Sequence, residues 1–407
     1  MRGTETEQNG RVGEHVAVLD TTLRDGEQSA GVAFSLRDKL EISEQLEALG
    51  VDVIEAGFPT SCVGDHKAVR AVARRVRSSS VCALTRAIEA DVDETWQALR
   101  EAVAPRIHIV VSTSDIHLDH QLHKRVEEVA DMARSSVSRA RRYTDDVQFS
   151  AMDATRSDPE GLARVVAAAV AAGATTINLP DTVGGARPAQ VQALIRDIVR
   201  RVPALEDRVV SFHGQDDLGL STANTLAAVE AGARQVELAV NGIGERAGNT
   251  PFEEVVVALR MHASGLGADT RIDTRGIFAV SRLVEERSGL CVAPNKAVVG
   301  RNAFRHASGI HQDGVIKERT TYEIIDPADI GHPCGSEIVL GKLSGRHGFA
   351  ARVHALGIEL SPAALARAFD RFKAVAEEKR EVGDEDLRRL CLENSSRGAE
   401  AWPGPGV

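Results

Sequence analysis

The sequence predicts an α/β protein in which eight strand-and-helix units close into a (β/α)8 or TIM barrel, followed by a mainly helical C-terminal lid and linker region. Between residues 16 and 241 a short apolar run, a polar turn and a helix-like segment recur in the same order. Strands that are separated by helices must run parallel, and eight parallel units most economically close into a barrel. The eight apolar runs lie at residues 16–20, 51–57, 79–85, 106–112, 146–152, 175–181, 208–213 and 235–241.

Three helix-to-strand junctions are near copies of one another, which is a second sign of a repeated unit. They read L-G-V-D-V-I-E at residues 49–55, A-G-A-T-T-I-N at 172–178 and A-G-A-R-Q-V-E at 231–237. An open doubly wound sheet is the alternative, but no strand carries a G-x-G-x-x-G turn where a dinucleotide site needs one. The nearest stretch, residues 241–249, follows the eighth strand and has its third glycine one residue late.

Local signals support the individual elements. Residues 16–20 form an apolar run with β-branched residues, which suits a buried strand. Ser35 can cap the helix that follows, with Asp38 three residues on, and Gly50 is placed to end it. Beyond the barrel only helix-like sequence remains, at residues 362–379 and 384–392.

We expect four parts along the chain. They are a disordered polar leader at residues 1–15, a catalytic barrel at 16–275, a linker and lid region at 276–395 and a flexible tail at 396–407. The leader lacks the apolar core of a signal peptide, and no apolar run approaches the ~20 residues that span a bilayer. Five scattered cysteines without a C-x-x-C pair fit reduced thiols, so we expect a cytoplasmic protein.

The composition excludes some functions. Apolar residues make up 43% of the chain and charged residues 27%, which is typical of a globular protein. The net charge of -10 argues against nucleic acid as the main partner. A small anionic substrate stays possible, because the arginines and lysines near its site decide that.

Residues capable of chemistry gather where the predicted strands end, which is the face that carries the active site in such barrels. The first strand runs into D-T-T-L-R-D-G-E-Q at residues 20–28, with three carboxylates and a guanidinium. The helix-to-strand junctions hold mostly Gly, Ala and Val instead, which favours an active site over an ion-paired turn. Polar residues after later strands are Thr85, Arg86, Ser150, Asp153, Asp181, Thr182, His213, Gln215, Asp216, Asp217, Asn241 and Asn249.

Asp25 and His213 are the natural pair for a divalent cation. A carboxylate oxygen and a neutral imidazole suit Mg²⁺, Mn²⁺, Co²⁺ or Zn²⁺. Gln215 and Asn249 can add only neutral carbonyl oxygens. The alternative is that His213 is a structural hydrogen-bonding residue, but we expect Asp25 across the same barrel mouth, and this favours the metal.

Several long motifs together resemble the 2-isopropylmalate synthase and homocitrate synthase family. Within the barrel they are residues 20–28, N-L-P-D-T-V-G at 178–184, D-L-G-L at 217–220 and N-G-I-G-E-R-A-G-N at 241–249. Beyond it they are S-G-I-H-Q-D-G at 308–314 and G-K-L-S-G-R-H at 341–347. The resemblance extends from about residue 16 to beyond residue 357.

The resemblance implies an acyltransferase that converts the acyl group to an alkyl group on transfer. In a Claisen-type condensation, deprotonated acetyl-CoA adds to the ketone of a 2-oxo acid, and thioester hydrolysis then releases a 2-substituted malate and CoA. It implies that Asp25, His213 and Asn249 hold the metal, which polarises the ketone, and that Arg24 stabilises the alkoxide. Thr182 and His108 match positions that hold the oxo acid, and we also count Glu245 as catalytic.

Beyond the barrel, His311 and Tyr322 match the family's catalytic histidine and tyrosine. These resemble a lid that reaches into a neighbouring subunit's barrel, so the resemblance implies a homodimer with shared active sites. A base and an acid near the thioester are what enolisation requires. Leucine-regulated members carry a further C-terminal domain, and we expect no such domain here.

The chain departs from the family at three positions. Gln215 stands where a second histidine ligand belongs, and an amide oxygen suits harder ions than imidazole does. Met152 replaces an acid in the pocket formed with Ser150, and Gly185 replaces an aromatic residue. Losing a carboxylate and a ring makes room and removes a negative potential.

We therefore expect an acceptor with an anionic side chain, such as phosphonopyruvate, a phosphinopyruvate, oxaloacetate or 2-oxoglutarate. A phosphonopyruvate acceptor would give a 2-phosphonomethylmalate, as in antibiotic biosynthesis. The alternative is a 2-isopropylmalate synthase acting on 2-oxoisovalerate, because Met152 also makes the pocket more apolar. A lyase similar to hydroxymethylglutaryl-CoA lyase and an inactive homologue, which would explain Gln215, are two further alternatives.

Overall fold

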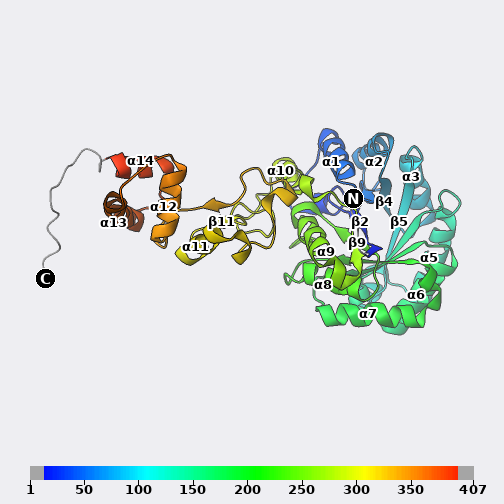
Figure 1. Ribbon diagram of the computed structural model, residues 1–407. Coiled ribbons are helices and arrows are strands. Elements are labelled where there is room, and N and C mark those ends of the chain that lie inside the picture. The colour runs from blue at the N-terminus through cyan, green and yellow to red at the C-terminus, as the bar shows by residue number, and fades with distance from the viewer. Residues whose placement is uncertain (1–12, 393–407) are drawn as a thin grey trace, which may run out of the picture. The chain divides into compact units, whose positions relative to one another are not determined.

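Eight parallel strands close into a barrel in the computed structural model, which describes residues 13–392. Each strand pairs with the next along the chain, and the last pairs with the first, Leu19 with Glu237 (Figure 1). The predicted barrel is confirmed, and all eight predicted runs contribute a strand. The strands are β2 (Ala17–Asp20), β3 (Val53–Glu55), β4 (Ser80–Arg86), β5 (Pro105–Ser112), β6 (Val147–Met152), β7 (Thr176–Asp181), β8 (Val209–Gly214) and β9 (Gln235–Leu238).

Helices cover the outside of the barrel (Figure 1). The predicted cap of α1 is present, since Ser35 Oγ accepts a hydrogen bond from the Asp38 N–H and the Asp38 carboxylate accepts one from the Ser35 N–H. Gly50 follows the last residues of this helix with a φ of 81°, a conformation that glycine adopts readily. The helices are α1 (Leu36–Ala48), α2 (Val63–Arg75), α3 (Glu89–Leu99), α4 (Asp115–His117), α5 (Val126–Ala140), α6 (Pro159–Ala171), α7 (Pro188–Arg201), α8 (Ser221–Glu230), α9 (Phe252–Leu266) and α10 (Ile277–Ser288).

The barrel interior contains a continuous polar network. Arg106 Nη1 donates to Gln235 Oε1 at 2.6 Å, and Gln235 Nε2 donates to Gln148 Oε1 at 2.8 Å. Gln148 Nε2 then donates to Glu237 Oε1 at 2.6 Å. Branched apolar side chains usually fill such a barrel, so this network is a departure from the common pattern. The network connects Arg106, inside the barrel, to Glu237 at the mouth.

The ends of the barrel unit are closed by short elements. The expected leader ended at His15, but β1 (Glu14–His15) pairs in parallel with β10 (Ala268–Asp269), and residues 1–12 lie outside the described residues.

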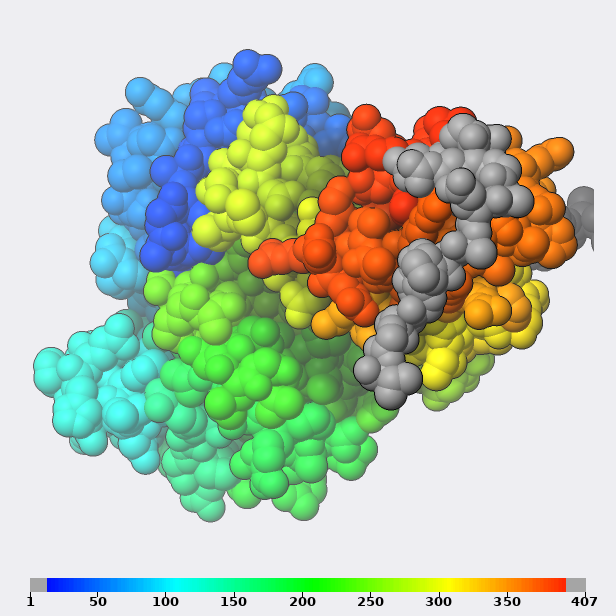
Figure 2. All heavy atoms as spheres, turned by 90° about the vertical axis from the view of Figure 1, so that its left-hand side faces the viewer, coloured from blue at the N-terminus to red at the C-terminus, as the bar shows by residue number. Residues whose placement is uncertain are grey.

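Arg287 of α10 lies 3.1 Å from Glu41 of α1, and Figure 2 shows the yellow-green surface of α10 against the blue surface of α1. The chain divides into two compact units, residues 1–292 and 293–407.

The second unit is mainly helical. Phe349, Phe369 and Phe372 pack together in its core, with ring centroids 5.0 to 5.8 Å apart. The predicted tail, residues 396–407, lies outside the described residues. None of the helices within residues 13–392 has the length and apolar character that crossing a membrane requires. The elements are β11 (Arg305–His306), α11 (Gly309–Lys317), β12 (Glu337–Ile338), α12 (Arg346–Ala355), α13 (Pro362–Glu378) and α14 (Asp384–Leu392).

Candidate active site

The turn after β2 is held by its own side chains. The Asp20 carboxylate accepts hydrogen bonds from the Thr22 N–H at 2.9 Å and from the Thr22 hydroxyl at 3.0 Å. Thr22 Oγ1 in turn accepts one from the Val240 N–H. Complete burial raises the pKa of Asp20 to about 7. The turn therefore fixes the backbone that carries Arg24 and Asp25 to the barrel mouth.

Arg24, Glu55, His108 and Ser150 form a hydrogen-bonded chain across one half of the mouth, which we call the closed half. Arg24 Nε donates to Glu55 Oε2 at 2.6 Å, and Glu55 Oε1 lies 2.6 Å from His108 Nδ1. His108 Nε2 lies 2.6 Å from Ser150 Oγ, which accepts a hydrogen bond from Asn178 Nδ2 at 2.8 Å. Since Ser150 accepts from Asn178, its own hydroxyl proton is free to be donated to His108.

The charges of the closed half compensate each other. Burial by itself would raise the pKa of Glu55, but the Arg24 guanidinium and then His108 lower it to about 2. Burial disfavours the Arg24 cation, yet the carboxylates of Glu55 and Asp25 raise its pKa above the usual value. Arg24 therefore stays a cation and Glu55 an anion, and the guanidinium is held ready for a developing negative charge.

Asp25, His213, Gln215 and Asn249 occupy the other half of the mouth, which we call the open half. His213 Nε2 lies 3.5 Å from Asp25 Oδ2, and Gln215 Nε2 lies 3.2 Å from the same oxygen. Gln215 and Asn249 are held together by an isolated antiparallel β-bridge. Glu237 Oε2 lies 3.1 Å from His213 Nδ1 and so orients the ring. The structure thus brings together the residues that the sequence nominated for a metal.

The open half fits a divalent cation. Among the described residues, the buried side-chain oxygens Gln215 Oε1 and Asn249 Oδ1 are without a hydrogen-bond partner. Such an oxygen costs about 1–3 kcal/mol when it stays unsatisfied, and a cation would satisfy it. Burial lowers the pKa of His213, but Glu237 and Asp25 raise it more, so the ring already lies in a negative field. A carboxylate, an imidazole and two amide oxygens are ordinary ligands for Mg²⁺, Mn²⁺, Co²⁺ or Zn²⁺.

A second group of potential ligands, Glu55, Cys82 and His108, lies inside the closed half. Burial raises the pKa of the Cys82 thiol well above its usual value, so the thiol stays protonated. Both ring nitrogens of His108 and both oxygens of Glu55 already have partners within the chain. This group therefore fits a cation less well than the open half does.

Three further predicted residues lie around the mouth. Thr182 is half-buried, and its hydroxyl accepts a hydrogen bond from the Asp153 N–H at 2.9 Å. Met152 ends β6 and is half-buried. Glu245 is exposed, and it is its backbone N–H that faces Asp25 Oδ1, at 3.5 Å.

His311 and Tyr322 lie together in the second unit. Their rings stack with centroids 4.0 Å apart and an interplanar angle of 18°. A Cβ atom at Gly314 would come within 2.5 Å of the Tyr322 ring, so only glycine leaves room for this stack. Both rings are exposed on this unit.

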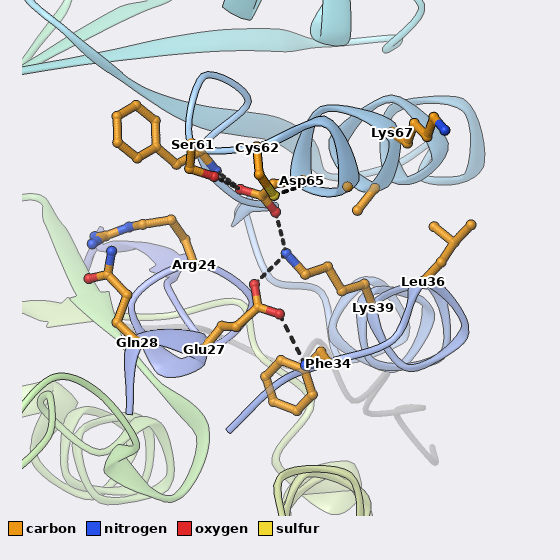
Figure 3. A pocket seen from close by; sticks show the side chains of 13 residues that line it. Arg24, Glu27, Gln28, Phe34, Leu36, Lys39, Ser61, Cys62, Asp65 and Lys67 are labelled. Carbon is orange, nitrogen blue, oxygen red and sulfur yellow. Dashed lines mark hydrogen bonds and ion pairs between the residues drawn. The ribbon is translucent and has the colours of Figure 1, made fainter. Parts of the chain in front are cut away.

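A cavity of about 560 Å³ lies beside the mouth, between the turn after β2 and helices α1 and α2. Arg24 and Gln28 reach it from the turn, and Leu36 and Cys62 line it from the helices. Figure 3 shows the Lys39 ammonium between the carboxylates of Glu27 and Asp65, at 2.7 and 2.6 Å. The Leu36 side chain is half exposed at this cavity.

Sequence reasoning missed Glu55, Asn178 and Glu237. The three near-identical junctions each end at one of these residues, and all three side chains are buried at the mouth. A polar residue at the same place in three apolar repeats was the signal that could have found them. Gln148 links His108 and Glu237 in the structure, but it is not part of a repeated junction and had no comparable signal in the sequence.

Comparisons with known proteins agree with this architecture. Residues 15–284 match the family model described as HMGL-like, and residues 298–380 match the one described as homocitrate synthase post-HMGL domain-like. The chain is 53% identical over 380 residues to a 2-isopropylmalate synthase of Pelotomaculum thermopropionicum, covering 93% of this chain and 75% of that protein. It is 49% identical over 382 residues to one of Pyrococcus abyssi, covering 94% and 78%.

Solved structures with the same fold include two HMG-CoA lyases. The Bacillus subtilis enzyme has a TM-score of 0.59 at 20% identity, over 72% of this chain and 98% of that one. The Acinetobacter baumannii enzyme, in complex with coenzyme A and 3-methylmalate, has a TM-score of 0.56 at 21% identity, over 68% and 92%. At this level of identity the likeness establishes the barrel fold alone.

Proposed function

The chain belongs to the HMGL-like family, and from this premise we propose that it condenses acetyl-CoA with a 2-oxo acid. One observation carries the proposal. A buried Arg24 cation and a donor set that fits a divalent cation face the same barrel mouth, in a chain 53% identical to a 2-isopropylmalate synthase. The same identity favours a synthase over a lyase, because the lyases resemble this chain at about 20% only.

In the proposed reaction the methyl group of acetyl-CoA loses a proton, and its carbon forms a bond to the ketone carbon. The ketone oxygen takes up a proton and becomes a hydroxyl group. Water then adds to the thioester, the carbon–sulfur bond breaks, and CoA leaves from a 2-substituted malate. The protein must therefore stabilise an oxyanion and place a base and an acid near the methyl group.

The residues of the mouth divide these tasks. Asp25, His213, Gln215 and Asn249 would hold the divalent cation, which supplies Lewis-acid polarisation when bound. Arg24, fixed by Glu55, stabilises the negative charge that develops on the ketone oxygen. The Glu245 N–H helps to hold the Asp25 carboxylate in place.

The acceptor's carboxylate is bound by a neutral hydrogen-bond donor, the Thr182 hydroxyl. The Thr182 hydroxyl already accepts from Asp153, so its own proton is free to be donated to the substrate. His108 and Ser150 are held by each other, by Glu55 and by Asn178, so they shape the wall of the acceptor's pocket, and Met152 ends the same strand as Ser150.

The base and the acid come from the second unit, in which His311 and Tyr322 stack. The same unit exposes large apolar side chains: Ile310, next to His311 in the chain, is 75% exposed, Ile324 79% and Leu343 70%. Exposed apolar groups of this size mark an interaction surface. We propose that the barrel mouth of a second copy covers them, so that the enzyme is a homodimer.

For the acceptor we propose a 2-oxo acid with an anionic side chain, as in phosphonopyruvate, oxaloacetate or 2-oxoglutarate. Met152 is neutral where the family carries an acid. Gly185, which lacks the family's ring, lines a cavity of about 170 Å³ with Asp181 and Val183. The second candidate is 2-oxoisovalerate, and the relatives' identity as 2-isopropylmalate synthases favours it.

The test is CoA release from acetyl-CoA, followed as free thiol with Mn²⁺ or Mg²⁺. The panel contains 2-oxoisovalerate, 2-oxoglutarate, oxaloacetate and phosphonopyruvate. Turnover that prefers an anionic acceptor supports the first candidate, and turnover with 2-oxoisovalerate alone refutes it. Absence of thiol release with every acceptor and metal refutes the condensation and leaves the inactive homologue.

Met152→Glu restores the family's acid and sharpens this test. A carboxylate about 4 Å from an anionic tail costs about 4 kcal/mol at the effective dielectric near a protein surface, so kcat/KM for an anionic acceptor should fall at least tenfold. Met152→Gln is the matched control, because it has the same size without the charge. Equal losses in the two variants would show that shape rather than charge selects the acceptor.

A further inference from the structure

We propose that the side-chain amide nitrogen of Gln215 replaces the divalent cation as the partner of Asp25 and His213 when no cation is bound. Cation binding then requires the amide to rotate, so that its oxygen faces the ion. The proposal rests on the proposed function, because the ion concerned is the one that the condensation uses. It assigns to this chain's glutamine a second role besides that of a ligand.

The groups around Gln215 are hydrogen-bond acceptors. His213 Nδ1 lies 3.1 Å from Glu237 Oε2, so the proton of the neutral ring sits on Nδ1 and leaves Nε2 as an acceptor. Asp25 Oδ2 is an acceptor as well. Gln215 Nε2 lies 3.2 Å from Asp25 Oδ2 and 3.3 Å from His213 Nε2, so its two hydrogens can be shared between them.

Asn249 shows the contrasting arrangement. The Thr21 hydroxyl donates to the Leu238 carbonyl at 3.1 Å, so it can only accept from Asn249 Nδ2, which lies 3.0 Å away. This fixes the Asn249 amide with its oxygen buried and without a partner. No neighbour fixes the amide of Gln215 in the same way, except the two acceptors that a cation would bind.

Turning the Gln215 amide over exchanges its oxygen and nitrogen. Without a cation, the exchange would place Gln215 Oε1 against Asp25 Oδ2 and His213 Nε2, and three acceptors repel one another. With a cation between them, the same three atoms become ligands. The side chain therefore has one favoured orientation in each state, and the cation must displace an internal donor before it binds.

Two consequences follow for metal binding. Breaking the two hydrogen bonds of the amide weakens the apparent affinity by on the order of tenfold. An amide oxygen is also a harder ligand than imidazole, so the preference shifts from Zn²⁺ toward Mg²⁺ and Mn²⁺.

The test compares Gln215→Leu, Gln215→Glu and Gln215→His with the wild type, using full-length protein stripped with EDTA at pH 8. Calorimetric titration with Mn²⁺ and Zn²⁺ measures affinity, and thermal unfolding measures the stability of the metal-free protein. We expect Gln215→Leu, which keeps the size but loses the donor, to lower the unfolding midpoint without metal. Gln215→Glu should lower it further and should bind Mn²⁺ at least tenfold more tightly. Gln215→His should gain more affinity for Zn²⁺ than for Mn²⁺.

An unchanged midpoint in metal-free Gln215→Leu would overturn the proposal. A crystal structure of the wild type with Mn²⁺ decides the matter without any variant. A Gln215 side-chain atom at about 2.2 Å from the ion must be oxygen, and this result supports the rotation of the amide. An amide that remains hydrogen-bonded to Asp25 beside a bound ion, or no Mn²⁺ binding at millimolar concentration, refutes it. Loss of CoA release with these binding results intact would refute the condensation alone.

Discussion

The two halves of the barrel mouth differ in how completely their polar groups are satisfied. In the closed half both oxygens of Glu55 and both ring nitrogens of His108 have partners at 2.6 Å. In the open half two buried amide oxygens have none, and the side-chain contacts of Asp25 and His213 are 3.1 to 3.5 Å long. The closed half is therefore organised before any ligand arrives, whereas the open half needs a cation to complete it.

Gln148 connects the halves. Its Nε2 lies 3.2 Å from His108 Nε2 and donates to Glu237 Oε1 at 2.6 Å, and Glu237 orients His213. The rigid half can thus hold the ring of the incomplete half in place. This arrangement suits a site in which the ion comes and goes while the oxyanion-binding groups stay fixed.

Glu55→Gln should break the closed half and have the largest effect. The variant leaves the largely buried Arg24 cation without its nearer carboxylate, which costs about 3 kcal/mol of the free energy of unfolding. Misplacing Arg24 should also lower kcat by on the order of 10²-fold. Urea unfolding and thiol release measure the two effects. Glu101→Gln, in an exposed ion pair with Arg70 and Arg74, is the control and should leave both quantities nearly unchanged.

Adding a cation should stabilise the open half. At a free Mn²⁺ concentration 100 times its dissociation constant, the free energy of unfolding should rise by about 2.7 kcal/mol over the EDTA-treated protein. His213→Ala should abolish this increase because it removes a ligand. If His213→Ala kept the full increase, the ion would bind elsewhere, and the comparison between the halves would fail.

Asp20→Asn should separate a pH effect that belongs to neither half. The folded pKa of Asp20 is about 7, above the ordinary value of 3.8. The folded state therefore binds the extra proton between about pH 4 and 7, and stability falls as the pH rises through this window, by at most about 1.4 kcal/mol per pH unit. The variant should flatten this slope, so it should be slightly less stable than the wild type near pH 4, where the Thr22 hydroxyl loses its acceptor, and more stable than the wild type above pH 7, where no buried carboxylate has to ionise. A slope that persists in the variant would place the titrating group elsewhere.

The barrel and much of its mouth could be predicted because they depend on local pattern. Apolar runs separated by helices fix eight parallel strands, and closure in chain order brings Asp25 at the first strand end to His213 at the seventh. In the structure Asp25 Oδ2 and His213 Nε2 lie 3.5 Å apart, and closure of the barrel is sufficient to explain why these two residues meet. The roles of these residues as metal ligands, and of Arg24, His311 and Tyr322 as catalysts, remain predictions.

The interior could not be predicted in the same way. The repeated junctions mark Glu55 and Glu237 as unusual, but their partners are defined only when the strands are in register and the side chains meet inside the barrel. Gln148 gains its meaning only from His108 and Glu237, which are 40 and 89 residues away in the chain. The orientation of the Gln215 amide likewise depends on two acceptors, Asp25 on the turn after β2 and His213 at the end of β8.

The polar network below the mouth has a consequence for how the chain folds. Arg106 of β5 finds acceptors in Gln148 of β6 and Gln235 of β9, which both belong to the second half of the barrel. A half barrel that ended after β5 would bury this guanidinium without its acceptors, so partly assembled barrels are unstable relative to the complete barrel. We expect the eight strands to close in a single cooperative step, and separately expressed halves to assemble only when they are mixed.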